Sequence, residues 1–162
     1  MSGRQSTPVS FYAVLLRRAF LVGSTVWAVA IPLATFVASR PAAASVAYGF
    51  ALVVYAIGHV VCHQLPIRSF HLWTMTLPVC ARCTGIYAGA AATALAMAVS
   101  GRRPDATRGA SRARAVLLAA LVPTAATLVF EWSTGTMPAN WIRALAGLPL
   151  GAAVAWAIGM VN

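Results

Sequence analysis

Long apolar runs recur five times along this chain, and they restrict its possible folds more than any other feature. A helix that crosses a bilayer needs roughly 20 apolar residues. Only helices and closed barrels can cross, because backbone groups find no partner in hydrocarbon, and the alternating pattern of strands is absent. The runs cover residues 19–39, 43–61, 85–99, 115–130 and 144–161. The sequence therefore predicts an all-α, polytopic membrane bundle of about five transmembrane helices, the third and fourth of which need flanking residues to reach full length.

Charge is too scarce to cover a soluble bundle. Only 9% of the residues are charged, whereas soluble domains contain about a quarter. Asp105 and Glu131 are outnumbered by twelve arginines, which gives a net charge of +10. Nucleic-acid binding would need these arginines on a soluble face, but they lie between apolar runs, where arginine sets membrane orientation. We expect one integral membrane domain over residues 1–162, in the cell membrane, with lipid and not nucleic acid around it. Heavy use of Ala and Arg without Lys is typical of a GC-rich bacterial genome.

The arginine distribution does not by itself orient a bundle of five crossing helices. One side would hold Arg4, Arg17, Arg18, Arg68, Arg82 and Arg143. The other would hold Arg40, Arg102, Arg103, Arg108, Arg112 and Arg114, so the counts are equal. If Arg68, Arg82 and Arg143 are reserved for a functional site, they do not count toward membrane orientation. The remaining arginines then predict that the basic loop 101–114 faces the cytoplasm and that the segment 62–84 faces outward. Arg17 and Arg18, next to the first run, oppose this orientation.

All three cysteines of the chain fall in the segment 62–84. Cys80 and Cys83 form a C-x-x-C pair, a spacing that lets two sulfurs bind one metal or close a small disulfide. Cys62 and His63 supply a third and a fourth ligand, and three thiolates with one imidazole make a tetrahedral set for zinc or iron. Adjacent residues rarely ligate one ion together. Two other histidines are therefore alternatives for the imidazole: His59 and His71.

The state of these cysteines has more than one interpretation. Thr84 is a good N-cap for the third helix, and a helix N-terminus together with Arg82 favours a thiolate at Cys80 or Cys83. That property suits metal binding and thiol redox chemistry equally. The alternative is that the three cysteines pack as small apolar groups with no chemistry at all.

A second group of candidates combines arginines with one acid. Arg68 and Arg82 lie near helix ends, where a guanidinium either reaches lipid headgroups or holds a phosphate or carboxylate. Glu131 borders an apolar run, and a carboxylate at membrane depth is usually paired. Arg143 is its expected partner, although Glu131 is also a candidate metal ligand or base. The candidate set for an anionic lipid or small-molecule ligand is Arg68, Arg82, Glu131, Asn140 and Arg143.

Two pairs of glycines predict close helix packing. Gly85 and Gly89 in the third helix, and Gly147 and Gly151 in the fifth, follow the G-x-x-x-G pattern that lets helix backbones approach. We expect the two helices to pack through these faces.

The segment 62–89 resembles a family of uncharacterised bacterial membrane proteins, the domain of unknown function 2085. The similar residues are Cys-His-Gln at 62–64, Pro-x-Arg-Ser-Phe at 66–70 and Cys-x-Arg-Cys-Thr-Gly-Ile-Tyr-x-Gly at 80–89. Asn140, Arg143, Gly147 and Gly151 continue the likeness, which covers roughly residues 50–155; Glu131 stands where Asp is more usual in the family. The resemblance implies that His63 belongs with the cysteines and leaves the activity open.

Three functions remain compatible with the sequence. The first is a metal-binding membrane protein, whose metal is structural if all four ligands bind and catalytic if one position stays open. The second is a membrane thiol–disulfide oxidoreductase that uses Cys80 and Cys83, with Cys62 as the shuttle. The third is a carrier or lipid-handling protein that binds an anion through its arginines. Neither an enzymatic activity nor an oligomeric state follows from the sequence.

Overall fold

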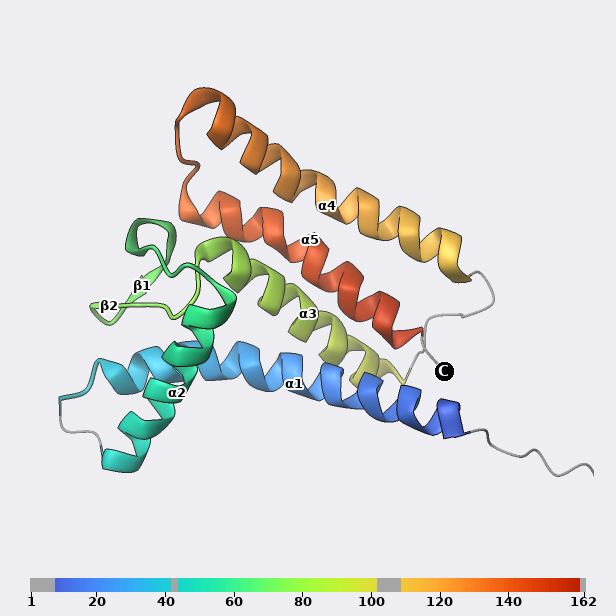
Figure 1. Cartoon of the computed structure of the whole chain (residues 1–162), viewed down its shortest axis with the longest axis horizontal. Helices are drawn as coiled ribbons and strands as arrows, with labels where there is room; N and C mark the ends of the chain where they lie inside the picture. The colour runs from blue at the N-terminus through green and yellow to red at the C-terminus, as the bar shows by residue number, and fades with distance from the viewer. Residues whose placement is uncertain (1–7, 42–43, 102–108, 161–162) are drawn as a thin grey trace, which may run out of the picture.

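The computed structural model of the chain describes residues 8–41, 44–101 and 109–160, and it is a bundle of five α-helices (Figure 1). The elements in order are α1 (Pro8–Ala38), α2 (Ser45–Val61), η1 (Pro66–Arg68), β1 (His71–Leu72), β2 (Met75–Thr76), α3 (Ala81–Ser100), α4 (Gly109–Thr134) and α5 (Asn140–Gly159). The predicted all-α fold is confirmed. Flanking residues lengthen the third and fourth apolar runs to helices of 20 and 26 residues. Four helices, α1, α3, α4 and α5, are long and apolar enough to cross a membrane.

The helix α2 differs from the sequence expectation, because it is only 17 residues long and runs obliquely across α1 (Figure 1). At its start, the Tyr48 hydroxyl donates to the Arg40 carbonyl just after α1. At its other end, Gly58 lies against the Pro78 carbonyl, just before α3. Both ends of α2 therefore lie at the same end of the bundle. Arg40 lies at the end that also holds the segment 62–80, and not at the opposite end, as five full crossings would require.

The helices α3 and α5 form the tightest contact in the molecule. They run in the same direction, side by side (Figure 1), and their contact is made by glycines, which lets the backbones touch. A methyl group added at any of the four glycines would collide with a carbonyl of the other helix: Gly85 with Ala144, Gly89 with Leu148, Gly147 with Arg82 and Gly151 with Ile86. The starts of α3 and α5 consequently lie together.

A two-stranded hairpin, which the apolar pattern does not predict, precedes α3. His71 pairs with Thr76 and Leu72 with Met75 in antiparallel register. The two turn residues, Trp73 and Thr74, have φ values of 49° and 71°, as a tight two-residue hairpin requires. After the hairpin, Leu77 and Val79 are buried against Ile31 of α1, together with Cys62, which follows α2, and side chains of α3. This packing fixes the segment that leads into Cys80.

Large apolar side chains on the outer faces of the helices are exposed, as expected when lipid is the solvent. Leu52 of α2, Leu118 and Val122 of α4 and Val29 of α1 are each more than half exposed. A groove of about 570 Å³ lies at the other end of the bundle, between α1 and α3, with Arg17 and Arg18 in its lining. It is remote from the cysteines and is mainly apolar.

Candidate functional site

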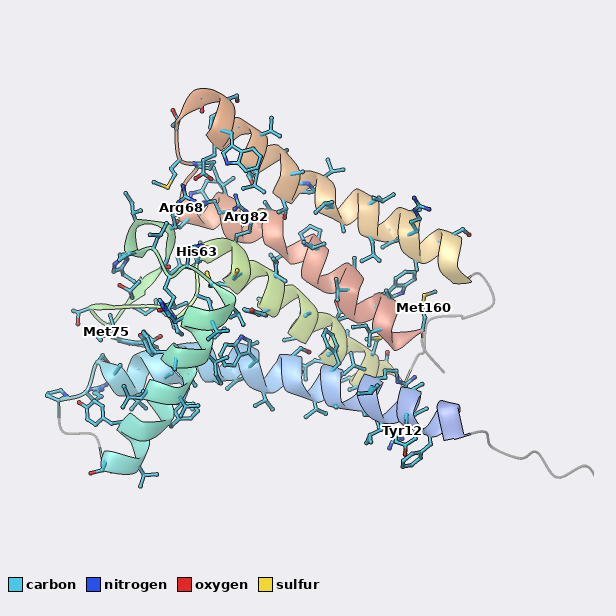
Figure 2. The ribbon with its side chains drawn as sticks, viewed as in Figure 1. Tyr12, His63, Arg68, Met75, Arg82 and Met160 are labelled. Carbon is cyan, nitrogen blue, oxygen red and sulfur yellow. The ribbon has the colours of Figure 1, made fainter. Side chains whose placement is uncertain are left out.

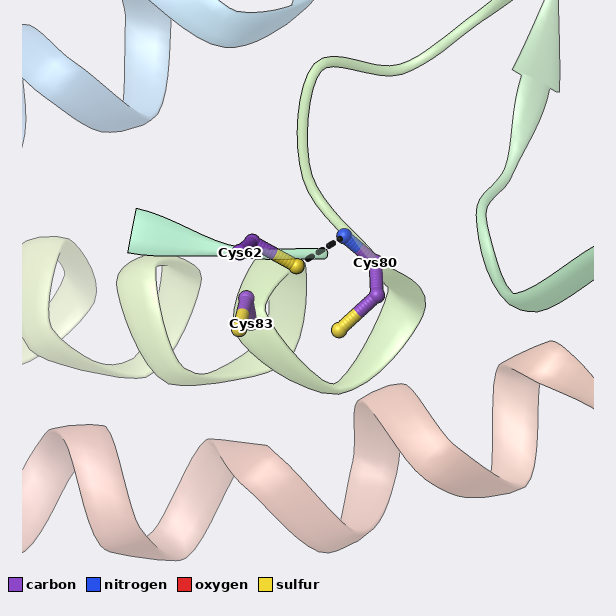
Figure 3. Close-up of side chains that lie close together, drawn as sticks. All are labelled: Cys62, Cys80 and Cys83. Carbon is purple, nitrogen blue, oxygen red and sulfur yellow. Dashed lines mark hydrogen bonds between the residues drawn. The ribbon is translucent and has the colours of Figure 1, made fainter. Parts of the chain in front are cut away.

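The three cysteines converge between the end of α2 and the start of α3 (Figure 3). The sulfur atoms of Cys62, Cys80 and Cys83 all lie within 4.8 Å of one another, and each cysteine is half-buried with a free thiol. Cys62 is extended and ends α2. The backbone N–H of Cys80 donates to the Cys62 sulfur over 3.2 Å. In a tetrahedral zinc site, with Zn–S bonds of about 2.3 Å, the sulfurs stand about 3.8 Å apart. The cluster is therefore close to the geometry that one metal ion imposes.

Gln64 and Gly58 position the cluster. The Gln64 side-chain amide donates to the carbonyls of Tyr55 and Pro78, over 2.9 and 2.7 Å, and so ties α2 to the segment between β2 and Cys80. Gln64 has a φ of 45°, an unfavourable value for a residue with a side chain. Gly58 leaves the space that both the amide and the Pro78 carbonyl occupy. The sequence showed Gln64 only as part of the resemblance to a family, and gave no sign of the role of Gly58.

Cys80 is the cysteine best suited to be a thiolate. Hydrogen bonds from the Cys83 thiol, from the backbone N–H groups of Cys83 and Arg82 and from Cys62 outweigh burial and lower the pKa of Cys80 from 9.0 to about 5. The expectation that Thr84 caps α3 is wrong. The helix begins earlier, with Cys80 as its N-cap, and the Thr84 hydroxyl donates to the Cys80 carbonyl. Cys80 and not Thr84 therefore lies at the positive end of the helix dipole.

The histidines lie outside the cluster of sulfurs. His63 follows Cys62 directly but is exposed, as are His59 and His71. Among the described residues, the only side chains that bring potential ligand atoms together at this point are the three cysteines. His63 lies at the same end of the bundle (Figure 2), and its role as a fourth ligand stays a prediction.

The second set of candidates gathers around Glu131 at the end of α4. Its carboxylate is 7% exposed, and three guanidinium groups from different elements approach it. Arg68 of η1 lies 2.5 Å from Oε1, Arg143 of α5 lies 3.4 Å from Oε2, and Arg82 of α3 lies 3.8 Å from Oε2. The sequence expectation of a Glu131–Arg143 pair thus understates the cluster, since the carboxylate has three cationic neighbours.

The guanidinium groups of this arginine cluster are incompletely hydrogen-bonded. Arg143 is 1% exposed; among the described residues its guanidinium has one polar partner besides Glu131, the Met137 sulfur at 3.8 Å, which is a weak acceptor. Arg82 donates to the Thr127 hydroxyl over 3.2 Å. The Nε atoms of Arg82 and Arg143 are buried and find no acceptor in the part of the chain that the structure describes. Asn140 joins from the start of α5 by donating to the Ser69 carbonyl. Thr127 carried no signal in the sequence, because a lone threonine in an apolar helix is unremarkable.

The two clusters share the first turn of α3. Cys80 and Cys83 flank Arg82 in the chain, so one turn sends thiols to one side and a guanidinium to the other. Arg68 and Arg82 lie close to each other, because both reach the Glu131 carboxylate, and His63 lies at the same end of the bundle (Figure 2). Cys80 is near enough to Arg143 for the two to interact electrostatically. The result is a site at one end of the bundle in which a group of thiols adjoins a group of guanidinium groups.

Comparison with known proteins places the chain in a family. The family model described as "Predicted membrane protein (DUF2085)" matches residues 62–157, which is more than half of the chain. The chain belongs to this family. The matched region contains both the cysteine cluster and the arginine cluster.

Relatives add little about activity. The chain is 47% identical over 38 residues to an uncharacterised protein, MJ1492, of Methanocaldococcus jannaschii. The likeness spans 24% of this chain and 24% of that protein, so it covers about a quarter of the relative's length. This relative is archaeal, so the comparison does not assign the chain to bacteria. No solved structure matches.

Proposed function

We propose that this membrane protein binds one thiophilic metal ion, zinc or iron, through Cys62, Cys80 and Cys83. The observation that carries the proposal is the convergence of three sulfurs within 4.8 Å from two separate helix ends. Soft thiolate ligands in this number select zinc or iron over magnesium or calcium. The N–H donated by Cys80 to the Cys62 sulfur supports the same reading, since hydrogen bonds to sulfur stabilise metal thiolates.

The fourth coordination position decides whether the metal is structural or catalytic. Three protein ligands leave one position of a tetrahedron for water or a substrate, as in catalytic zinc sites. Exposed His63 adjoins Cys62, and its binding would close the site and make the metal a link between α2 and α3. A bound metal at an open site would supply Lewis-acid chemistry.

Metal analysis of the purified protein tests this proposal. We expect about one zinc or iron per chain in the wild type, and little metal in Cys80→Ser, because a hydroxyl is a poor replacement for a thiolate ligand. His63→Asn is the matched comparison: it keeps the metal if three cysteines suffice and loses it if the imidazole closes the site. Equal metal content in the wild type and in Cys80→Ser, or none in the wild type after zinc or iron is supplied, would refute metal binding here.

Thiol–disulfide exchange is the second candidate, and the lowered pKa of Cys80 favours it. A thiolate at Cys80 would attack a substrate disulfide, and Cys83 would then displace the substrate and form the Cys80–Cys83 disulfide. Alkylation of the protein in native membranes, followed by mass spectrometry, separates the two functions. A Cys80–Cys83 disulfide that responds to oxidant supports exchange, whereas thiols that are protected until a chelator is added support metal binding.

The fold also supports an extracytoplasmic position for both clusters. With α2 confined to one end, the described residues at the opposite end include four arginines: Arg17, Arg18, Arg112 and Arg114. Four more arginines lie outside the described residues but are next in sequence to the helix ends on that side: Arg4, Arg102, Arg103 and Arg108. The cluster end holds four, and three of these contact Glu131. The positive-inside rule then assigns the basic end to the cytoplasm. A fluorescent protein fused after α5 should fold and fluoresce in the cytoplasm; a reporter active only outside the cytoplasm at that position would reverse the orientation.

A further inference from the structure

The arginine cluster carries more positive charge than its own residues neutralise. Arg68, Arg82 and Arg143 contribute three positive charges and Glu131 contributes one negative charge, which leaves +2 in one place. Arg82 and Arg143 are buried, and burying uncompensated charge is costly. Glu131 is the only acidic residue in the described part of the chain, so this excess points to a missing anion.

The hydrogen bonds of the cluster point the same way. A guanidinium offers five N–H donors, but within the described residues Arg143 contacts one carboxylate oxygen at 3.4 Å and one thioether at 3.8 Å. Charge-assisted hydrogen bonds are normally 2.7–2.9 Å long. Arg82 is still farther from the carboxylate, at 3.8 Å, and among the described residues the Nε atoms of Arg82 and Arg143 have no acceptor. Glu131 Oε1 also forms no hydrogen bond of good geometry, although Arg68 lies 2.5 Å from it. Unpaired donors of the cluster therefore outnumber its unpaired acceptors.

We propose that Arg68, Arg82 and Arg143 bind the doubly charged phosphate group of a phosphate monoester, or inorganic phosphate itself. A phosphate monoester carries about −1.5 to −2 charges at pH 7 and three strong acceptor oxygens, which matches the excess of +2 and supplies the absent acceptors. A carboxylate or a phosphodiester carries a single negative charge and would leave the site partly uncompensated. This inference does not depend on metal binding at the cysteines.

The surroundings of the cluster suit the binding of an anion. The helices α3 and α5 run in the same direction, and Arg82 and Arg143 lie in their first turns. Helix N-termini favour anions through their dipoles and free N–H groups. Arg68 is 38% exposed, whereas Arg143 is almost fully buried. Arg68 is thus the member that can swing aside to admit a ligand from the aqueous or headgroup side.

Titration of the detergent-solubilised full-length protein with inorganic phosphate tests the proposal. Binding is followed by calorimetry, with acetate at matched ionic strength as the control anion. We expect Arg68→Gln to weaken phosphate binding by about tenfold or more, the loss of one charge-assisted hydrogen bond. Arg40→Gln removes the same charge at the same end of the bundle, outside the cluster, and should leave binding unchanged. Equal effects of the two substitutions would show non-specific attraction and overturn the proposal.

Glu131→Gln separates a binding role from a purely structural one. The carboxylate competes with phosphate for the same guanidinium groups, so its neutralisation should tighten phosphate binding several-fold, even though the protein without ligand is less stable. If Glu131→Gln gains no affinity and no stabilisation from phosphate, the cluster is structural only.

Lipid discs of defined composition distinguish the source of the phosphate group. Phosphatidic acid carries a phosphate monoester, whereas phosphatidylglycerol carries a diester, and both are diluted into phosphatidylcholine. Retention of phosphatidic acid over phosphatidylglycerol, lost in Arg68→Gln, assigns the site to a lipid headgroup. Binding of inorganic phosphate without that lipid preference assigns it to a soluble ligand. Absence of both overturns the proposal.

Discussion

The cysteine cluster and the arginine cluster lie at the same end of the bundle and share the first turn of α3, but they are built in opposite ways. The cysteine cluster comes from two points of the chain and is arranged by backbone groups, through the Cys80 N–H and the carbonyls that Gln64 ties together. The arginine cluster comes from four elements and is held by long side chains around one carboxylate. The three thiols are candidate ligands for a metal cation, whereas the three arginines exceed the one carboxylate between them by two positive charges and form a candidate site for an anion. Two sites that differ in chemistry and in construction can thus share one helix turn, because the remaining residues of each site come from other parts of the fold.

The largest difference between the clusters should appear in their response to pH. Cys80 changes charge in an accessible range, because its pKa falls from 9.0 to about 5 in the folded protein, whereas arginine stays charged. In metal-free protein, alkylation of Cys80 should continue at pH 6, far below the range of an ordinary thiol, and should decline only near pH 5. The Cys80 thiolate also stabilises the folded protein relative to the unfolded chain. This stabilisation is fully present above pH 9 and is lost as the pH falls through about 5.

The alkylation rate of Cys80, measured by peptide mass spectrometry across pH 4–10, checks this prediction. Unfolded protein in denaturant is the control and should titrate near 9. A folded-state midpoint as high as that of the control would show that the hydrogen bonds around Cys80 do not hold a thiolate.

Removing the acid should damage the arginine cluster and spare the cysteines. Glu131→Ala leaves Arg143 buried without its carboxylate, and breaking a buried pair in this way costs about 3–5 kcal/mol. We expect a clear fall in the thermal unfolding midpoint, measured in detergent without phosphate, and unchanged metal content per folded chain. Ser133→Ala, on the exposed side of the same turn, is the control. Loss of metal in Glu131→Ala would mean that the clusters are not independent.

Gly58→Ala should destabilise the protein less than Glu131→Ala does, and it should affect the cysteine cluster instead of the arginine cluster. A methyl group there would collide with the Pro78 carbonyl and the Gln64 amide, and overpacking of this kind costs about 1–3 kcal/mol. Because the collision pushes Cys80 away from Cys62, Gly58→Ala should weaken metal binding and leave phosphate binding intact. The matched control is Gly49→Ala in the same helix, where an added methyl meets no atom within 4 Å. Competition with a chromogenic chelator measures the metal affinity; equal values for the two variants would contradict the positioning role of Gly58.

The sequence predicted the helices well because apolar runs and lipid solvation are local properties. It did not predict the oblique course of α2. Its 17 residues are at the lower limit for a crossing helix, and its direction is decided by contacts of Ala51 and Val54 with Ala30 and Ala34 of α1. Such contacts between distant residues leave no periodic signal in a single sequence.

In the candidate site, too, the sequence revealed the local patterns and not the contacts between residues far apart in the chain. The C-x-x-C spacing is local, and it drew attention to Cys80 and Cys83 directly. Glu131 and Arg143 could be paired in advance because they flank one short connection. Arg68 and Arg82 reach the same carboxylate because the glycine contact sets the position of α3 against α5. Thr127 accepts a hydrogen bond from Arg82 because of the position of α4. Neither arrangement could be inferred before the helices were placed.

The shared first turn of α3 limits how the two clusters can change in evolution or by mutation. Ala81 is fully buried between Cys80 and Arg82, and the Arg82 carbonyl is pressed against Gly147 of α5. Any substitution that shifts this turn displaces a thiol and a guanidinium together. Variants of Ala81 or Arg82 will therefore be pleiotropic, and clean genetic separation of the two properties requires changes outside the turn, such as those at Gly58, Arg68 and Glu131.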